Sequence, residues 1–221
     1  GISLATHIAK CAGVSDRKLG DIESDIKSLN AKSFPVLDDA RGEEMAQRIL
    51  KAREEADSVG GVTETVICGT PAGVGEPWFD SVESIISHAA FSLGGVKGIE
   101  FGAGFAAADM KGSECNDPLR VSGGRIVTTT NNNGGVNGGI TNGMPIVFRC
   151  AVKPTPSIAQ TQDTVDFIKN ENTQLSIHGR HDPAIIRRIC PVLDSVAALC
   201  VADMLSLRYG TDVLTKGVDD K

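Results

Sequence analysis

Two short motifs enclose the stretch from Lys153 to Pro183, which opens with Lys153-Pro154-Thr155-Pro156-Ser157 and closes with Gly179-Arg180-His181-Asp182-Pro183. The two prolines of the first motif restrict its backbone, so its hydroxyl and ammonium groups have few positions to occupy. In the second motif an aspartate and a proline precede an apolar run, which predicts a helix capped by Asp182 with Pro183 at its first position. The free N–H groups of such a helix point back at the preceding arginine and histidine and favour an anion. The stretch therefore predicts a binding place for an anionic ligand.

The composition indicates an aliphatic core and an acidic surface. Of the 221 residues, 41% are hydrophobic but only 4% are aromatic, so the core must consist mainly of Ile, Val, Leu and Ala. The net charge of -6 argues against a general nucleic-acid or membrane-surface binder, but Arg180, Arg187 and Arg188 can still form a local basic pocket. No apolar run of membrane-spanning length and no signal peptide is recognised.

The cysteines predict a reduced, cytoplasmic protein. They stand at positions 11, 68, 115, 150, 190 and 200. They form no CxxC pair, and none has a histidine at zinc-finger spacing, so no metal site is expected. Most lie in apolar runs, as core cysteines do. The first residue is glycine, which indicates a processed chain or a piece of a longer one.

The pattern of apolar residues predicts mixed strands and helices. Strands are expected over residues 2–14, 62–68, 146–152 and 158–166, and helices over residues 39–59 and 80–92. The first of these helices is expected to be exposed and amphipathic and to end at Gly60-Gly61. Residues 15–39 read as a loop with one short helix, and residues 106–126 as an exposed excursion. Because strands and helices alternate irregularly, without regular βαβ units, the predicted class is α+β.

The C-terminal part is expected to form a buried helix. Its apolar positions cover a wide stripe, but Pro191 is a poor interior residue of a helix. We therefore expect a short turn over residues 183–190, the main helix over 191–207 and a frayed tail over 210–221.

Two features of the sequence concern the packing of the middle of the chain. Residues 128–143 are polar and rich in glycine, which fits either a flexible linker or a loop that presents backbone N–H groups to a ligand, and composition does not separate the two. The large aromatic residues are expected to be core residues; they are Trp78, Phe79, Phe91, Phe101 and Phe105.

Five motifs occur in a fixed order along the chain. They are Thr70-Pro71-Ala72-Gly73-Val74-Gly75-Glu76-Pro77, Val96-Lys97-Gly98-Ile99-Glu100-Phe101-Gly102, Asn131-Asn132-Asn133-Gly134-Gly135 with Gly138-Gly139-Ile140, Lys153-Pro154-Thr155-Pro156-Ser157 and Gly179-Arg180-His181-Asp182-Pro183. In this order they resemble chorismate synthase. The resemblance covers essentially the whole chain, which implies a single domain over residues 1–221.

The resemblance implies an activity and a set of partners. A chorismate synthase performs the last common step of the shikimate pathway: it eliminates phosphate and a ring proton, in anti geometry across a 1,4 relationship, from 5-enolpyruvylshikimate 3-phosphate. Reduced FMN is required, without net redox change. The family enzyme is a cytoplasmic homotetramer whose monomer packs helices between antiparallel sheets, which agrees with the α+β prediction.

One departure from the family is large. The family's N-terminal part carries a Gly-x-Ser-His-Gly loop, a second catalytic histidine, arginines that hold the substrate and an Arg-Ser-Ser-Ala-Arg-Glu-Thr segment at the flavin. None of these is in this sequence. The chain therefore resembles the C-terminal part of a chorismate synthase, and its histidines at 7, 88, 178 and 181 receive no catalytic role.

The matched motifs imply a set of site residues. Arg180 faces the flavin and the substrate phosphate, and Asp182 lies near flavin N5 and places or accepts a proton. Contact with FMN is implied for Gly94, Gly95, Gly138, Lys153, Pro154, Thr155, Pro156, Ser157 and Arg180. Glycine at 94 and 95 leaves only backbone contact, where the family often has a side chain at the first position.

Simpler interpretations exist for the same residues. Asp182 can be only an N-cap, Arg180 a solvated arginine and Lys153 the exposed end of a strand. His181 can bond to backbone or across a subunit interface.

The sequence leaves more than one hypothesis for the chain as a whole. The first is a chorismate synthase without its N-terminal portion, and so without turnover on its own. The second is a non-enzymatic module that binds flavin or phosphate, or serves assembly, on the same fold. A third, a different flavin enzyme, agrees less well with the motifs. Because partner strands and helices are missing, we also expect the chain to self-associate, or to leave residues 128–143 disordered without FMN.

Overall fold

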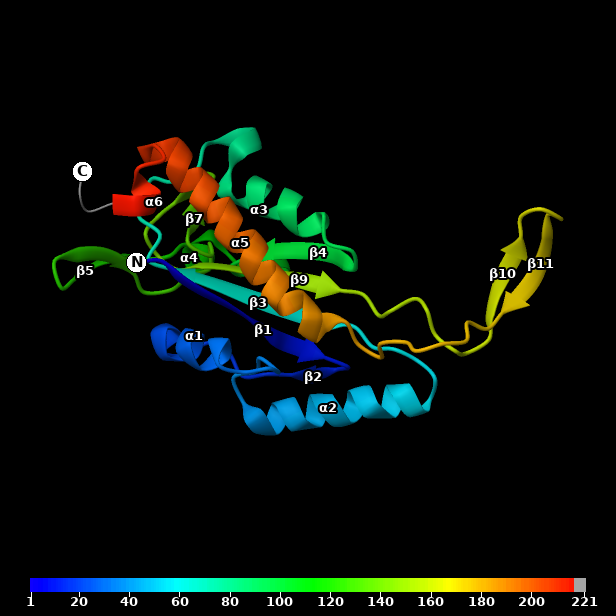
Figure 1. Ribbon diagram of the computed structural model, residues 1–221. Coiled ribbons are helices and arrows are strands. Elements are labelled where there is room, and N and C mark those ends of the chain that lie inside the picture. Colours follow the sequence, from blue (N-terminus) through cyan, green and yellow to red (C-terminus); the bar gives the residue numbers. More distant parts are fainter. Residues whose placement is uncertain (217–221) are drawn as a thin grey trace.

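A five-stranded sheet runs through the centre of the protein, for which the computed structural model describes residues 1–216 (Figure 1). The strands are β1 (Ser3–Cys11), β2 (Val14–Ser15), β3 (Gly61–Cys68), β4 (Val96–Phe101) and β9 (Ile146–Val152). They lie in the order β2-β1-β3-β9-β4, and every neighbouring pair is antiparallel. The predicted α+β class and the strands expected over 62–68 and 146–152 are confirmed. The strand expected over 2–14 ends earlier, at Cys11, where the chain turns into β2.

The longer helices begin where the sequence supplies a capping side chain, with the exception of the last. They are α1 (Ile22–Asn30), α2 (Asp39–Glu54), α3 (Val82–Phe91) and α5 (Ile186–Tyr209). The Asp38 carboxylate accepts a hydrogen bond from Ala40 N–H (2.9 Å), and the Ser81 hydroxyl accepts one from Ser84 N–H (3.0 Å). The short helix expected within 15–39 and the helix expected over 80–92 are therefore confirmed.

The two faces of the sheet bury different partners, because successive strand residues point to opposite sides. On one face Ile8, Ile67 and Phe148 belong to the main core, together with residues of α3 and α5. On the other face Ala5 and Val66 form a smaller core with α1. Figure 1 shows α3 and α5 on one side of the sheet and α1 and α2 on the other.

Helix α5 begins at Ile186 and continues through Pro191, so the turn predicted over 183–190 is wrong. Pro191 lies near the start of the helix, where its missing N–H removes only the bond to the Arg187 carbonyl. Burial of Ile186, Ile189 and Cys190 against the rest of the core offsets that loss.

The length and composition of α5 are also those of a membrane-spanning helix, with a mean hydropathy of 1.7 over an 18-residue window. The expectation that no apolar segment reaches such a length is therefore wrong. One side of the helix is buried in the main core. This burial identifies α5 as a core helix of the fold.

Helix α2 ends at Glu54, before the predicted Gly60-Gly61. The N–H of Ala56 donates to the Arg53 carbonyl (3.1 Å), and the N–H of Asp57 donates to the Ala52 carbonyl (2.8 Å). Ala56 has a φ of 56°, so a left-handed residue closes the helix in a Schellman motif. Prediction failed here because alanine, instead of the usual glycine, takes the left-handed position.

Smaller elements surround the sheet. They are η1 (Trp78–Asp80), η2 (Gly104–Asp109), α4 (Gly112–Cys115), the hairpin β5 (Leu119–Ser122) and β6 (Arg125–Thr128), the short pair β7 (Val136–Asn137) and β8 (Ile140–Thr141), and α6 (Val213–Lys216). The exposed excursion predicted over 106–126 is confirmed, since β5 is exposed throughout. The predicted fraying of the tail is wrong for residues 213–216, where Val213 is buried, and residues 217–221 lie outside the described part.

A second hairpin extends away from the sheet as an arm, formed by residues 162–175. Its strands are β10 (Gln162–Asp166) and β11 (Glu171–Leu175), which pair with each other. Figure 1 shows the arm at the end of two long connecting segments. The strand expected over 158–166 is thus shorter than predicted, and its partner is β11 and not the central sheet.

Residues 128–143 are held by hydrogen bonds within the chain, so neither the flexible linker nor the expected disorder is what the structure shows. The Asp117 carboxylate accepts bonds from the N–H groups of Asn132 (2.7 Å) and Asn133 (2.9 Å), and from the hydroxyl of Thr130 (2.6 Å). Gly135 N–H donates to the Asn131 side chain (2.8 Å). Several N–H groups that the alternative interpretation offers to a ligand are therefore already used.

Most of the large aromatic residues are exposed, against the prediction that they form the core. Trp78, Phe79 and Phe105 are each more than 80% exposed, and Phe91 is 52% exposed. Phe101 alone packs on a core ring, that of Phe148, at 5.6 Å between centroids. The core is instead aliphatic, as the composition indicated, and it includes the buried cysteines at 11, 150, 190 and 200, which are free thiols.

Candidate functional site

Three segments that are far apart in the sequence meet where β9 ends. They are residues 55–60, 153–157 and 179–183, and residues 94–95 approach them from the chain that follows α3. The hydrogen bonds run from Lys153 N–H to Gly95 O (2.9 Å), from Ser58 Oγ to Thr155 O (2.7 Å) and from Val59 N–H to Pro183 O (2.8 Å). The structure therefore brings the two motifs at the ends of the 153–183 stretch to one place.

The helix predicted to start at Asp182 is displaced. The N-cap residue of α5 is Ile185, which makes no side-chain capping bond. The carbonyl of Pro183 is bonded to the 55–60 segment, so the chain runs past that segment before the helix begins. The interpretation of Asp182 as an N-cap is therefore wrong.

Asp182 instead forms an ion pair with the first turn of α5. Its Oδ2 lies 2.7 Å from Nη1 of Arg188. The Asp182 side chain is 35% exposed, so the carboxylate lies at the surface of the site and not in the core. Its other oxygen, Oδ1, faces no hydrogen-bond donor in the described part of the chain.

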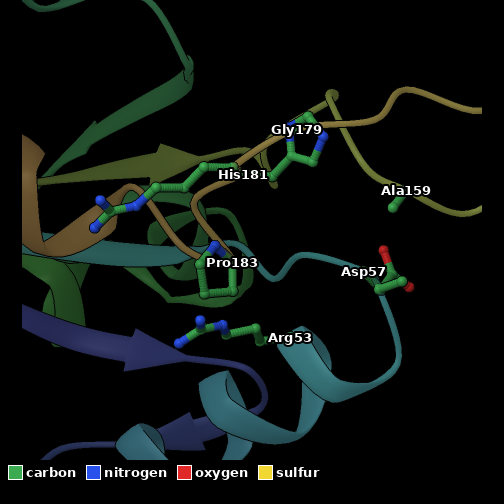
Figure 2. A pocket seen from close by; sticks show the side chains of 8 residues that line it. Arg53, Asp57, Ala159, Gly179, His181 and Pro183 are labelled. Atoms are coloured by element: carbon green, nitrogen blue, oxygen red, sulfur yellow. The ribbon is translucent and has the colours of Figure 1, made fainter.

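Two adjoining cavities, of about 230 and 270 Å³, open beside this ion pair. Both are lined by Arg53, Arg180, His181 and Pro183. Figure 2 shows the residues that line the first cavity: Arg53 extends from the end of α2 below Pro183, and Asp57 and Ala159 lie at the right of the view.

The charge of these cavities is positive. Within residues 1–216 neither Arg53 nor Arg180 has a carboxylate within ion-pair distance. His181 Nε2 lies 2.9 Å from the carbonyl of Ile177, and Asp57 is the one carboxylate in the wall of the first cavity. Each cavity is thus lined by both guanidinium groups and one carboxylate, Asp57 in the first and Asp182 in the second, and Asp182 is already paired with Arg188.

The first motif of the stretch contributes an unpartnered hydroxyl. Thr155 Oγ1 is buried and has no hydrogen-bond partner, while Lys153 and Pro156 are exposed. A buried hydroxyl without a partner is costly, and a bound group that supplies a donor or acceptor removes that cost. No ion pair of Lys153 is found among the described residues.

The predicted glycines fall into two groups. Gly94 and Gly95 follow α3, beside Lys153, and a Cβ on Gly94 has open space around it. Gly138 also has open space, but it lies beside Gly139, which packs on Ser81 at the start of α3. A helix of 10 residues is about 15 Å long, so Gly138 stands at the opposite end of α3 from Gly94. A single chain does not bring Gly138 next to the others.

A second group of charged residues crosses the sheet, and we call it the sheet ladder: His7, Glu64, Arg149 and Glu100, with Asp16 at one end. Neighbours in the ladder are directly opposed on β1, β3, β9 and β4. His7 bonds to Asp16 (3.0 Å) and Glu64 (3.2 Å), and Arg149 bonds to Glu64 (3.3 Å) and Glu100 (2.7 Å).

Every charged group of the sheet ladder has a partner within the chain, whereas Arg53 and Arg180 in the cavities have none among residues 1–216. Burial by itself lowers the pKa of His7, but the hydrogen bonds and charges of Asp16 and Glu64 outweigh it and raise the pKa above 6.5. Burial opposes ionisation of Asp16 and Glu64 too, yet their bonded donors lower both pKa values. Since every group is partnered, the ladder serves the fold and leaves no group free for a ligand.

Sequence reasoning missed Arg53 and the 55–60 segment. The signal that could have found them was weak: an arginine near the end of an exposed helix, followed by Asp57-Ser58-Val59-Gly60-Gly61. Only the two hydrogen bonds from Ser58 and Val59 show that the end of α2 belongs to the site.

Comparisons with known proteins agree on one family. A sequence model of the family described as chorismate synthase matches residues 1–206. A chorismate synthase of Methanosarcina acetivorans is 43% identical over 210 residues, which cover 95% of this chain and 57% of the relative. One of Korarchaeum cryptofilum is 49% identical over 166 residues, covering 74% of this chain and 46% of the relative.

A crystal structure of a chorismate synthase has the same fold, with a TM-score of 0.79 and 26% identity. The match covers all of this chain and 62% of that one. The chain thus spans little more than half the length of the relatives it matches. Taken with the five ordered motifs, these matches show that the chain belongs to the chorismate synthase family.

Proposed function

We propose that this chain forms one wall of the active site that converts 5-enolpyruvylshikimate 3-phosphate to chorismate with reduced FMN, in the shikimate pathway. The observation that carries the proposal is the meeting of residues 153–157 and 179–183 beside a positively charged cavity. The reaction expels phosphate, and a site that holds phosphate needs fixed positive groups.

The residues present fit an FMN molecule. The buried, unpartnered hydroxyl of Thr155 offers a hydrogen bond, the space at Gly94 admits a flat ring against backbone, and Lys153 offers an unpaired ammonium. Reduced FMN, when bound, supplies an electron-rich ring without net redox change. The residues proposed to hold it are Gly94, Gly95, Gly138, Lys153, Pro154, Thr155, Pro156, Ser157 and Arg180.

Arg180 and Asp182 are proposed to act on the two groups that leave the substrate. The guanidinium of Arg180 is planar, so two of its N–H groups can hold two phosphate oxygens as the C–O bond breaks. Arg188 holds Oδ2 of Asp182 at 2.7 Å, which leaves Oδ1 to accept a proton.

We propose further that this chain does not turn over alone and that the active form is a cytoplasmic homotetramer. The arginine and histidine loops that the resemblance places in the family's N-terminal part have no counterpart in this sequence. The position of Gly138 also supports assembly. Within one chain Gly138 lies at the opposite end of α3 from Gly94, so it can join the other proposed FMN residues only through a second copy.

Titration with FMN, followed by flavin fluorescence, tests the cofactor site. Saturable quenching is expected, and Arg180→Ala and Lys153→Ala should each weaken it about tenfold by removing a charge-assisted bond. Lys10→Ala, an exposed lysine of β1, is the matched control and should leave binding unchanged. If no saturable binding occurs, the alternative stands: a non-enzymatic assembly module on the same fold.

A turnover assay tests the rest of the proposal. Chorismate formation with reduced FMN should be absent for this chain and should return when the N-terminal family segment is supplied. Robust turnover by the chain alone would disprove its inactivity while supporting the assigned reaction.

A further inference from the structure

We propose that Arg53, on the last turn of α2, is an additional phosphate-binding residue that acts together with Arg180. The inference deepens the proposed function and rests on it for the identity of the ligands. It concerns a helix on the opposite side of the sheet from α5, outside both motifs of the 153–183 stretch.

The first support is geometric. Arg53 lines both cavities, and so do Arg180 and His181. In Figure 2 the Arg53 side chain extends next to Pro183, under the cavity. Two segments thus offer guanidinium groups to one space, from the end of α2 and from residues 179–183.

The second support is the way in which α2 is held. The bonds from Val59 to Pro183 and from Ser58 to Thr155 join the segment after α2 to both motifs, and Gln160 Nε2 donates to the carbonyl of Glu55 (2.8 Å). The left-handed Ala56 directs the chain from the helix into this segment. Arg53 is therefore fixed to the site through its backbone, three residues before the turn.

The third support is the charge balance. Neighbouring arginines of α2 have carboxylate partners: Arg41 lies 3.2 Å from Glu44, and Arg48 lies 3.7 Å from the same residue. Within residues 1–216 Arg53 has none, although Asp57 and Asp182 each line one of its cavities. The Asp57 carboxylate accepts a bond from Ser58 N–H (2.7 Å), and Asp182 pairs with Arg188. Two unpaired guanidinium groups around one cavity repel each other unless an anion lies between them.

A phosphate monoester is the ligand class that fits. It carries up to two negative charges and three terminal oxygens, enough to face two arginine forks at once. Both proposed ligands carry such a group: the phosphate of FMN and the 3-phosphate of the substrate. The experiment must therefore distinguish these two sources.

Binding measurements on Arg53→Ala, Arg53→Lys and Arg48→Ala test the inference. Arg48→Ala removes the same charge from the same helix outside the cavity and should change nothing. Three ligands are titrated: FMN, riboflavin and 5-enolpyruvylshikimate 3-phosphate. Riboflavin has the flavin ring of FMN but lacks the phosphate. Arg53→Ala should weaken at least one phosphate-bearing ligand about tenfold, and Arg53→Lys should recover part of that loss.

The ligand affected identifies the source of the phosphate. Loss for FMN without loss for riboflavin assigns Arg53 to the flavin phosphate, and loss for the substrate alone assigns it to the substrate phosphate. Three results would overturn the inference. In the first, Arg53→Ala weakens FMN and riboflavin equally; in the second, it has the same affinities as Arg48→Ala; in the third, no phosphate-bearing ligand binds.

The two proposals can fail separately. Flavin binding that depends on Lys153 but not on Arg53 leaves the proposed function intact and removes this inference. If FMN does not bind, but inorganic phosphate competes with 5-enolpyruvylshikimate 3-phosphate in a way that depends on Arg53, the phosphate site is supported and the proposed flavin function is not.

Discussion

At the scale of single residues, the sheet ladder shows how much one histidine can determine. His7 is fully buried, and both of its ring nitrogens face carboxylates. A ring that donates from both nitrogens must be protonated. Its positive charge separates Asp16 from Glu64, and removing it leaves two carboxylates buried without that partner.

Replacing this histidine should be strongly destabilising. His7→Gln removes the charge and keeps a polar side chain, and we expect it to lower the free energy of unfolding by roughly 3–5 kcal/mol, the usual effect of breaking a buried ion pair. Urea unfolding followed by circular dichroism measures the change. His88→Gln, at an exposed histidine of α3, is the control, and equal stability of the two variants would contradict a structural role of the ladder.

The ladder also predicts the pH dependence of stability. Since the pKa of His7 is raised above 6.5, its contribution is complete below that pH and is lost as pH rises through the raised value. Since the pKa values of Asp16 and Glu64 are lowered from 3.8 and 4.5, their contribution is complete above those values and is lost as pH falls through the lowered ones.

Unfolding free energies across this range check the signs. We expect the greatest contribution of the ladder between about pH 4.5 and 6.5, with a decline on the alkaline side that His7→Gln abolishes. A wild-type decline above pH 6.5 that persists unchanged in His7→Gln would assign it to other groups.

At the scale of elements, the end of α2 is strained by its own sequence. Ala56 takes a φ of 56°, where a Cβ is unfavourable and glycine is preferred. Ala56→Gly should therefore stabilise the protein, by about 0.5–1 kcal/mol. Thermal unfolding measures this, and Ala46→Gly, inside the same helix, should have the opposite sign. Destabilisation by Ala56→Gly would contradict the Schellman end.

The loop over 128–143 depends on one carboxylate. Asp117 accepts four hydrogen bonds from Thr130, Asn132 and Asn133, and these bonds outweigh burial and lower its pKa. Asp117→Asn replaces one of the two acceptor oxygens by an NH2 group, which cannot accept the hydrogen bonds of these donors, so the loop should open. Hydrogen exchange or limited proteolysis of 128–143 should show faster exchange or cleavage. Asp109→Asn, at an exposed position, is the control and should leave exchange and cleavage unchanged. Unchanged protection of the loop in both variants would exclude the proposal that Asp117 holds it.

At the scale of the whole molecule, apolar side chains stand exposed at several places. They include Phe167 and Ile168 at the tip of the arm, Leu199 and Leu207 on α5, and Val121 and Ile126 on the β5–β6 hairpin. A two-stranded hairpin is only marginally stable alone, so an assembly that covered the arm would stabilise it. The expectation of self-association stays a prediction, and these surfaces support it.

The single tryptophan provides a measurement of assembly. Trp78 is 84% exposed, so at high dilution its emission should be that of a hydrated indole and should be quenched readily by iodide. If association covers it, the emission should shift to the blue as concentration rises, in step with the mass measured by sedimentation. Blue-shifted, protected emission from a sample that sediments as a monomer would contradict the exposed position.

The sequence by itself determined those features that depend on neighbours along the chain. Apolar and β-prone runs predicted β1, β3 and β9, apolar residues at helical spacing predicted α2 and α3, and the five ordered motifs indicated the family. Each of the strand and helix signals is local, because these periodicities are set by residues a few positions apart.

Tertiary structure alone decided the features that depend on distant contacts. It carried α5 through Pro191, since buried contacts there offset a lost hydrogen bond. It joined His7 to Glu64 and Arg149 through strand register, and it brought Arg53 to Arg180 through the tethers at Ser58 and Val59. Residues more than a hundred positions apart meet there only because the sheet and its connections fix their backbones, and no pattern along the chain records that meeting.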